Sequence, residues 1–237
     1  MYAKPYKGLG MEGAVAKWYA GLTKKSLKDF EALAQRIAQQ LPPGSRVLEV
    51  APGPGYFAIE LAKLGDYRIA GLDISETFVD IARANAVAAN VRVDFRQGNV
   101  SAMRFPGSRF DFILCRAAFK NFSQPAEALA EMHRVLKPDG RALIIDLRRD
   151  ASKQSVGQAV DAMNLGSVNR VITKLTFRFM LLRRAYTKAE FAELASHSKF
   201  AGVEVTESPL GLEVLLTKGG SALIPPFGSL AAARAVG

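Results

Sequence analysis

The most constraining feature of this chain is an apolar run at residues 47–50 that breaks into a glycine-containing turn and then into a helix-forming segment. Gly53 and Gly55 carry no side chain and can adopt positive φ, so backbone N–H groups of such a turn can approach a ligand closely. Residues 53–58 also satisfy the dinucleotide-binding pattern G-x-G-x-x-G/A. The turn alone therefore leaves a nicotinamide or flavin enzyme open.

Segments farther along the chain recur at the spacing of a doubly wound α/β sheet. We expect further strands at residues 68–73, 91–96, 110–115 and 142–146. Asp73 ends the second strand 18 positions after Gly55, where a carboxylate can accept both ribose hydroxyls of an adenosine-type ligand. Asn99 follows the third strand, where an amide can face an adenine edge.

These ordered motifs, over about residues 45 to 150, resemble the class I S-adenosylmethionine-dependent methyltransferases. The likeness is greatest to the small-molecule branch that includes the ubiquinone and menaquinone C-methyltransferases, which share a phrase like the one at residues 110–129 and then R-V-L-K-P-x-G, here residues 134–140. The resemblance implies an α/β, Rossmann-like, doubly wound seven-stranded sheet of order 3-2-1-4-5-7-6, with an antiparallel last strand and helical caps. It implies S-adenosyl-L-methionine as the cofactor.

The resemblance also implies a set of cofactor-binding residues. These are Glu49, Ala51, Gly53 and Gly55 at the methionine end, Asp73 at the ribose, Ile74, Asn99 and Val100 around the adenine, and Cys115 and Arg116 along the methionyl group. Two of them depart from the family pattern: Ala51 stands where the first glycine is usual, and Asn99 stands where Asp is usual. An amide oxygen can still accept from the adenine amino group, so we expect weakened or altered binding.

Each of these residues also has a structural reading. Asp73 can cap the helix that starts near Ser75, and Asn99 can be a turn residue. Cys115 reads more readily as a small buried hydrophobe than as a reactive thiol. As the single cysteine, beside only two histidines, it permits neither an internal disulfide nor a zinc-type ligand cluster, so we expect no metal and an intracellular protein.

The chain reads as a single domain, because no repeat or linker divides it. We expect an N-terminal helical cap at 1–45, a cofactor-binding core at 46–147, inserted lid helices at 148–186, a helix and terminal hairpin at 187–218, and a tail at 219–237. Thr187 and Glu190 form a capping-box pattern at the start of the last helix. No apolar leader and no run of 18 apolar residues occurs, which favours a soluble cytoplasmic protein, or at most a membrane-peripheral one.

The net charge of +10 is unevenly distributed along the chain. Residues 1–46 carry +5 and residues 147–188 carry +7, whereas residues 47–146 are neutral and residues 189–237 carry −2. In this fold the two basic segments lie over the carboxyl ends of the strands, on the substrate side of the crevice. This placement suggests an acidic substrate or an anionic surface, although solubility alone explains many basic proteins.

The second basic segment predicts an amphipathic helix from Gly166 to Tyr186, with Arg170, Lys174 and Arg178 along one stripe. We favour a lid helix over membrane-surface contact, although a lipid-like substrate allows both. Nucleic acid is disfavoured as a partner, because no aromatics interleave with the basic stripe and residues 117–122 lack the N/D-P-P-Y/F motif of amide-nitrogen methyltransferases.

The expected reaction is an in-line methyl transfer to a small acceptor that is anionic or lipid-like. The candidate substrate residues are Tyr19, Lys120, Asn121, Arg148 and Arg149. In quinone-type relatives a histidine pair often occupies positions 120 and 121, and here neither residue is histidine. Three possibilities follow: an acceptor of low pKa such as a thiol or carboxylate, Lys120 as a base of lowered pKa, or Lys120 as an electrostatic clamp. We rank the clamp first, because Arg148 and Arg149 lie just past the fifth strand. Two alternatives remain: a non-catalytic S-adenosylmethionine-binding module, and an NAD(P)-dependent oxidoreductase.

Overall fold

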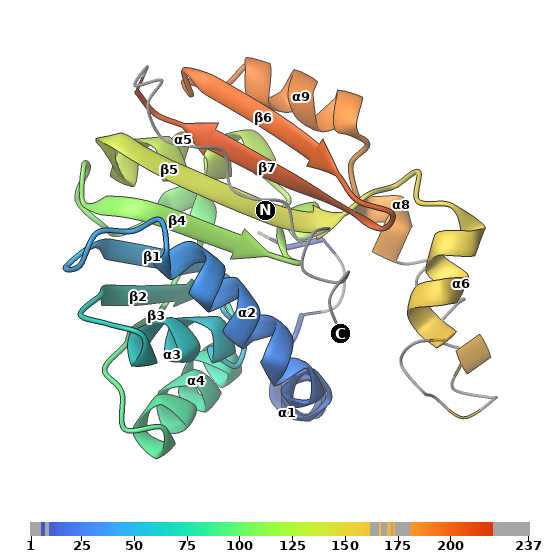
Figure 1. Cartoon of the computed structure of the whole chain (residues 1–237), viewed down its shortest axis with the longest axis horizontal. Coiled ribbons are helices and arrows are strands. Elements are labelled where there is room, and N and C mark those ends of the chain that lie inside the picture. Colours follow the sequence, from blue (N-terminus) through green and yellow to red (C-terminus); the bar gives the residue numbers. More distant parts are fainter. Residues whose placement is uncertain are drawn as a thin grey trace, which may run out of the picture.

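A seven-stranded sheet forms the centre of the computed structural model, which describes residues 6–7, 10–161, 166, 170–171, 173 and 181–219 (Figure 1). The strands lie in the order β3-β2-β1-β4-β5-β7-β6, which confirms the predicted topology. Their bounds are β1 Arg46–Val50, β2 Arg68–Asp73, β3 Asp94–Gln97, β4 Phe110–Arg116, β5 Leu136–Leu147, β6 Gly202–Glu207 and β7 Gly211–Thr217.

The first five strands run parallel, whereas β7 pairs antiparallel with both β5 and β6. The chain reverses its order between β3 and β4, since β1 pairs with β2 on one side and with β4 on the other. In open α/β sheets a ligand crevice forms outside the carboxyl ends of the strands at such a reversal. The fold therefore directs attention to the segments that follow β1, β2 and β4.

Helices cover both faces of the sheet. One face packs against α2, α3 and α4, and the other packs against α5 and α9. The helices are α1 Gly13–Thr23, α2 Leu27–Ala38, α3 Tyr56–Lys63, α4 Glu76–Ala88, α5 Pro125–Val135, α6 Lys153–Asp161, α8 Leu182–Arg184 and α9 Lys188–Ser196, and short 3-10 turns include η2 Val100–Ala102 and η3 Phe119–Asn121. Both layers are needed, because central parallel strands are apolar on both faces.

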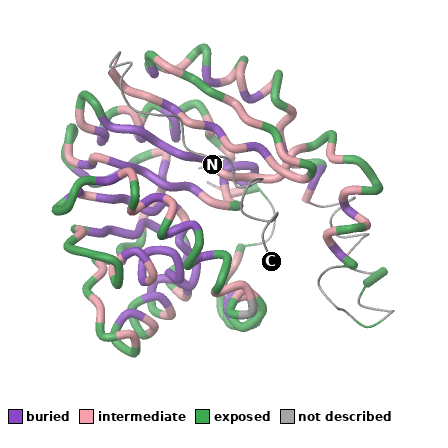
Figure 2. The backbone as a smooth tube through the Cα atoms, viewed as in Figure 1, coloured by how far each residue is buried: buried purple, intermediate pink, exposed green. Residues whose placement is uncertain are grey.

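The alternation of side chains along the strands explains the two cores. In β4, Phe112 and Leu114 pack with the α2–α4 layer, whereas Ile113 and Cys115 pack with the α5 and α9 layer. Figure 2 shows the central strands as buried along most of their length, with exposed residues on the outer helices. A third, smaller cluster joins Val156 and Val160 of α6 to Leu182 of α8.

Several local expectations can be compared with the observed elements. The capping box at Thr187 and Glu190 is confirmed, with both reciprocal hydrogen bonds present. The third strand begins at Asp94, three residues later than expected, and β5 begins already at Leu136 because Phe110 pairs with it before a register shift. Most of the predicted basic helix at 166–186, and the tail after Gly219, lie outside the described residues.

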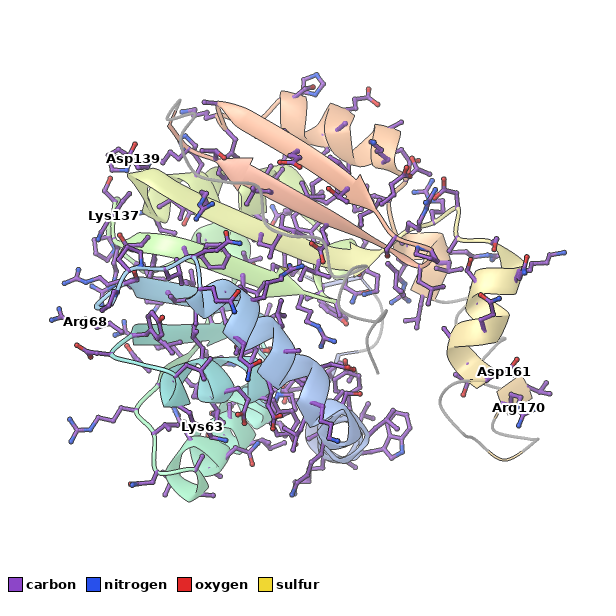
Figure 3. All side chains as sticks on the ribbon, viewed as in Figure 1. Lys63, Arg68, Lys137, Asp139, Asp161 and Arg170 are labelled. Atoms are coloured by element: carbon purple, nitrogen blue, oxygen red, sulfur yellow. The ribbon has the colours of Figure 1, made fainter. Side chains whose placement is uncertain are left out.

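Charged side chains extend from the rim of the molecule (Figure 3). Arg68 begins β2, and Lys137 lies near the start of β5, so both mark the edge opposite the carboxyl ends of the parallel strands. Asp161 and Arg170 form an ion pair at 3.7 Å at the end of α6, on the other side of the molecule. Among the described residues, no helix is both long enough and apolar enough to cross a membrane.

Candidate cofactor and acceptor site

The loop after β1 takes left-handed backbone conformations at three positions. The φ angles are +54° at Ala51, +54° at Gly53 and +78° at Gly55. A Cβ added at Gly53 would meet nothing within 4 Å, whereas one at Gly55 would lie 2.6 Å from the Phe95 ring. Gly55 is thus required by packing, and Gly53 leaves its peptide open to a ligand. Ala51 holds the same backbone region with a methyl group, which is unfavourable for an L-residue.

Asp73 at the end of β2 binds the same loop. Its Oδ2 accepts a hydrogen bond from Gly53 N at 2.9 Å, and its Oδ1 accepts from Ser75 N at 2.9 Å. The side chain is buried, and burial raises the pKa of Asp73 despite these two hydrogen bonds. The helix cap itself is Ser75, whose hydroxyl accepts from Phe78 N. The carboxylate therefore joins the β1 loop to the β2 end, at the predicted ribose position.

Glu49 lies beneath the loop and is only 3% exposed. Its Oε2 accepts from Ala58 N in the first turn of α3 at 3.1 Å. Burial raises the pKa of Glu49 to about 8, although the Ala58 N–H and the charge of Arg116 oppose the shift. A carboxyl with such a pKa can hold or release a proton near neutral pH.

The predicted adenine residues surround the ends of β2 and β3. Ile74 is 37% exposed beside the buried Asp73, so it offers an apolar surface at the crevice. Asn99 caps η2, with its Oδ1 accepting from Ser101 N at 3.0 Å, and Val100 is buried behind it. The cap uses one lone pair of the amide oxygen, and the second can accept another donor.

The end of β4 brings Cys115, Arg116 and Ala117 to the crevice. Cys115 is completely buried, and burial raises its thiol pKa well above the ordinary value, which agrees with the packing role. The Arg116 guanidinium lies 4.4 Å from the centre of the Phe30 ring, a cation–π contact. Ala117 is a second alanine with positive φ, at +58°. Strained backbone at the ends of β1 and β4 is typical of functional loops.

Lys120 is buried in the turn after β4. Its Nζ donates to Ala117 O at 2.6 Å and to Asp146 Oδ1 at 2.7 Å. Asp146 also accepts from Lys120 N through Oδ2 and from Leu147 N through Oδ1. The neighbouring Asn121 is 9% exposed. Lys120 thus ties the β4 loop to the end of β5, and its charge has a partner before any substrate arrives.

The two arginines after β5 are also paired. Arg148 binds Asp150 at 2.7 Å and Glu207 at 2.9 Å. Arg149 binds Glu190 at 2.6 Å and donates to Ala185 O at 2.9 Å. These contacts connect the end of β5 to β6 and α9, so both guanidinium groups join elements of the fold rather than facing Lys120 unpaired.

The N-terminal segment closes the cofactor end of the crevice. Tyr19 on α1 stacks edge-to-face on Phe78 at 5.9 Å, and burial raises its pKa. Tyr56 donates to Ala20 O at 3.0 Å, which fixes α1 to α3. The predicted substrate residue Tyr19 therefore lies between α1 and α4, and the charges of Arg116 and Asp146 act on its hydroxyl.

Three residues of this site were missed in the sequence. Asp146 is the partner of Lys120; Glu12 accepts from Glu76 N and Thr77 N at the start of α4; and Tyr6 forms an isolated bridge with Phe122. Burial raises the pKa of Tyr6, on which the charges of Arg184, Tyr19, Asp73 and Asp146 also act. A carboxylate at a strand end two residues before Arg148 was a usable signal for Asp146. Glu12 and Tyr6 carry no motif.

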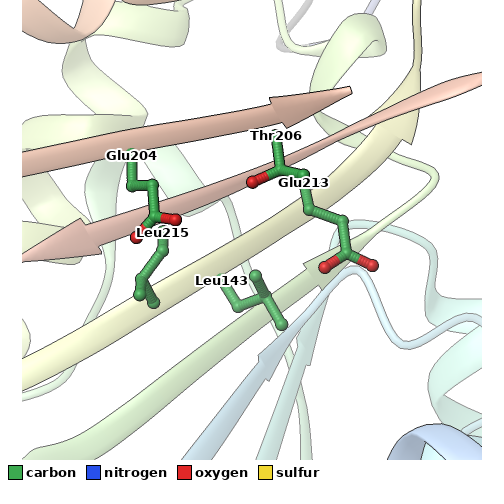
Figure 4. Close-up of a pocket in the computed structure, with 5 residues that line it drawn as sticks. All are labelled: Leu143, Glu204, Thr206, Glu213 and Leu215. Carbon is green, nitrogen blue, oxygen red and sulfur yellow. The ribbon is translucent and has the colours of Figure 1, made fainter. Parts of the chain in front are cut away.

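A separate shallow hollow lies on the sheet face formed by β5, β7 and β6 (Figure 4). It is lined by Leu143, Glu204, Thr206, Glu213 and Leu215. Glu213 is already bound by Arg36 of α2 at 3.1 Å. None of the lining residues belongs to β1 or to the loop after it. Within the described part of the chain no group of three or more His, Cys, Asp or Glu could hold a metal ion.

The residues at the carboxyl edge fit the adenosine and methionyl parts of S-adenosylmethionine. The observation that decides this is the open space at Gly53 beside the buried Asp73 carboxylate, with the apolar Ile74 exposed next to it. A sugar requires a charged acceptor for its hydroxyls, the base requires an apolar surface, and the charged tail requires an open peptide.

Comparison with known proteins agrees with this geometry. Residues 48–144 match the family described as methyltransferase domain. A demethylmenaquinone methyltransferase of Deinococcus radiodurans is 38% identical over 108 residues, which are 45% of each chain. A 2-phytyl-1,4-naphtoquinone methyltransferase of Synechococcus elongatus is 29% identical over 150 residues, covering 60% of this chain and 64% of that protein.

Among solved structures, a protein from Methanococcus maripaludis described as an S-adenosyl-L-methionine-dependent methyltransferase has the same fold. The two superpose with a TM-score of 0.70 over 94% of this chain and 100% of the other, at 20% identity. The match to the first curated relatives is shorter and spans about half of their length. The family match at residues 48–144 includes the β1 loop, Asp73, Asn99 and the turn after β4.

Proposed function

We propose that this chain, whose residues 48–144 form a methyltransferase domain of the class I S-adenosylmethionine-dependent type, transfers a methyl group to a small lipid-like acceptor with a quinone-type ring. The observation that carries the proposal is the loop after β1, where Gly53 is open and bound to the Asp73 carboxylate. The names of the relatives supply the acceptor class, since two of them are menaquinone or naphthoquinone methyltransferases.

The cofactor side is built from residues of the first three strand ends. In this proposal Asp73 accepts hydrogen bonds from the ribose hydroxyls, and Ile74 covers one face of the adenine. The Asn99 side chain accepts a hydrogen bond from the adenine amino group. Gly53 and Gly55 keep the methionyl part close to the backbone, with Ala51 and Cys115 behind it, and Val100 lies behind Asn99 at the adenine. When bound, S-adenosylmethionine supplies a methyl group on a positively charged sulfur, which makes it an activated donor.

The acceptor side is built from the β4 turn and α1. The chain must hold the acceptor atom about 3 Å from the methyl carbon, in line with the bond that breaks, and must exclude water. Tyr19 and Asn121 line this region in the proposal, and the aromatic cluster around the buried Phe119 packs behind the turn. Lys120, paired with Asp146 beneath the turn, fixes the path of the loop that would hold the acceptor.

The charge pairs favour a lipid-like acceptor over a strongly anionic one. Lys120, Arg148 and Arg149 each have a carboxylate partner within 3 Å, so none of them needs a substrate anion. Arg116 contacts the Phe30 ring, and its charge lowers the pKa of Glu49. We assign to Arg116 the role of binding the methionyl carboxylate. A phenolic or hydroquinone ring, with one acidic hydroxyl and an apolar tail, matches a site whose cations are already paired.

A second candidate is a non-catalytic S-adenosylmethionine-binding module. The left-handed Ala51 and the amide at Asn99 favour it, because both alter the usual cofactor loop. An NAD(P)-dependent oxidoreductase is less well supported, since the antiparallel β7 lies between β5 and β6 where dinucleotide-binding sheets continue in parallel.

Ligand binding and turnover separate these functions. A thermal-shift panel of S-adenosylmethionine, S-adenosylhomocysteine, NAD and NADP identifies the cofactor, since a ligand at 100 times its Kd adds about 2.7 kcal/mol to stability. We expect a shift only with the first two. Transfer of labelled methyl from S-adenosylmethionine to a short-chain demethylmenaquinol then tests catalysis. Binding without transfer to any quinol favours the binding module, and a shift with NAD alone overturns the proposal.

A further inference from the structure

Helix α1 presents an apolar stripe to solvent. Val15 is 49% exposed, Trp18 is 67% exposed and Leu22 is 43% exposed. These are three of the eight large apolar side chains exposed in the described part of the chain, so exposure of this kind is concentrated on one helix of 11 residues. Scattered exposed apolar residues are ordinary on a surface, but a continuous stripe marks a contact site.

Helical geometry separates this stripe from the packed side of α1. At about 100° per residue, positions 15, 18 and 22 fall within about 60° of arc. Ala16 and Ala20, the buried residues of the helix, lie on the opposite side, toward α3 and α4. In Figure 2 most of α1, which is viewed end-on at the margin of the molecule, is coloured as exposed. The stripe therefore has no partner among the described residues.

Lysines outnumber acidic residues around the stripe, and Glu12, the exposed residue before α1, has its carboxylate bound to the N–H groups of Glu76 and Thr77. Residues 13–28 contain four lysines and no Asp or Glu. The side chains of Lys17, Lys24 and Lys28 are exposed, and none of them forms an ion pair with the described residues. An exposed tryptophan and leucine on one face, with lysines on the polar face of the same segment, is the composition of a helix that lies in the interface of an anionic membrane.

We propose that α1 docks on an anionic lipid surface through Val15, Trp18 and Leu22, with the lysines binding the headgroups. A protein partner fits less well, because three side chains on one helix cannot supply the about 800 Å² per partner of a stable protein interface. A membrane needs no such area, since each lysine near an anionic surface adds about 1 kcal/mol.

The docking face adjoins the crevice. Met11, just before α1, accepts a hydrogen bond from the Ser75 hydroxyl at 2.7 Å, two residues after Asp73. Tyr19, between the outer stripe and Phe78, lies on the inner side of the same helix. A bound membrane would thus lie beside the entrance for the acceptor. This link to a lipid-like acceptor rests on the proposed function, whereas the docking itself rests on α1 alone.

The protein carries its own probe, because Trp18 is its only tryptophan. We expect vesicles of phosphatidylcholine and phosphatidylglycerol to move the Trp18 emission to shorter wavelength, and pure phosphatidylcholine vesicles to have much less effect. Salt at about 1 M, where the Debye length is about 3 Å, should reverse most of the shift. Val15→Glu and the double variant K17E/K24E should each weaken vesicle binding about tenfold or more, by loss of apolar burial and of headgroup attraction.

Val87→Glu is the matched control. Val87 is 80% exposed on α4, so the same apolar-to-acidic change there should leave vesicle binding unchanged. Emission that ignores anionic vesicles, or equal losses in the control, would overturn the proposal. A concentration-dependent emission shift without vesicles, together with a dimer in light scattering, would instead assign the stripe to a second copy of the chain.

S-Adenosylhomocysteine titrations of the same variants keep the two proposals apart. Normal cofactor binding without vesicle binding contradicts the docking surface and leaves the methyltransferase function standing. Vesicle binding in a protein that binds no S-adenosylhomocysteine supports the docking surface and contradicts the methyltransferase function.

Discussion

Nζ of Lys120 lies 2.7 Å from Oδ1 of Asp146, and the two side chains are only 4% and 8% exposed. The lysine also holds Ala117 O, the carbonyl of a residue with positive φ. The pair therefore fixes the path of the chain as it leaves β4, where the acceptor would lie. Removing one partner of such a buried ion pair is costly, because the remaining charge is left without its partner and without water to solvate it.

Lys120→Met should destabilise the protein by about 3–5 kcal/mol, because it leaves Asp146 buried without its cation. Urea unfolding followed by circular dichroism measures the change. Lys137→Met is the control: Lys137 binds Asp111 at the same 2.7 Å, but the side chains are 40% and 31% exposed, so the expected loss is about 0–1 kcal/mol. Equal losses in the two variants would mean that burial does not distinguish the pairs.

Ala51→Gly should stabilise the protein by about 1 kcal/mol, because Ala51 has a φ of +54°, where an L-residue is strained and glycine is not. Thermal and urea unfolding both report this gain. Ala84→Gly supplies the opposite control, since Ala84 is exposed within α4 and glycine there should cost about 1 kcal/mol. A loss at position 51 would show that the methyl group is needed for packing.

The sequence could predict some features of this structure and not others. The β1 turn and the Thr187 capping box depend on local patterns and were predicted from them, whereas the sheet order was predicted through the family resemblance. The pairing of Lys120 with Asp146 spans 26 residues and depends on how β4 and β5 align, which no local pattern encodes. The same holds for Arg148, whose partner Glu207 lies on β6. Charge totals predicted where the cations are, but not that carboxylates already neutralise them.

Glu49→Gln should make stability less dependent on pH. Because the pKa of Glu49 is raised from 4.5 to about 8, the folded protein binds more protons than the unfolded chain within that window. The contribution of Glu49 to the free energy of unfolding is therefore fully present below the unfolded pKa of 4.5. It falls by up to about 1.4 kcal/mol per pH unit as the pH rises toward the folded pKa of about 8. Above about pH 8 the variant should be more stable than the parent by roughly 2–4 kcal/mol, and near pH 5 the two should be similar.

Urea midpoints at the two pH values measure this difference. Glu204→Gln, at an exposed position on β6, is the control and should keep the pH dependence of the parent. A Glu49→Gln variant that loses stability equally at both pH values would indicate that the amide cannot replace the bond to Ala58 N.

Asn99→Asp should keep or improve the affinity for S-adenosylhomocysteine. The Oδ1 of Asn99 accepts from Ser101 N, and a carboxylate makes a stronger cap while offering a second charged acceptor to an adenine amino group. Isothermal titration calorimetry gives the affinity. A large loss would mean that the amide donates a hydrogen bond to the ligand, which would reverse the role assigned to this residue.

Asp73→Asn should weaken S-adenosylhomocysteine binding by about 1–3 kcal/mol, because the ribose diol loses its charged acceptor. The substitution keeps the shape of the side chain and one acceptor oxygen, so it can retain a hydrogen bond to Gly53 N or to Ser75 N, but not both. Some loss of stability is expected as well, and unfolding in the absence of ligand measures it separately from binding. Asp80→Asn is the control, since Asp80 is 69% exposed on α4 and its ion pair with Arg83 is 3.6 Å long. Calorimetry that finds equal affinities for Asp73→Asn and the parent would remove Asp73 from the ribose site and leave its carboxylate a purely structural link between the β1 loop and the end of β2.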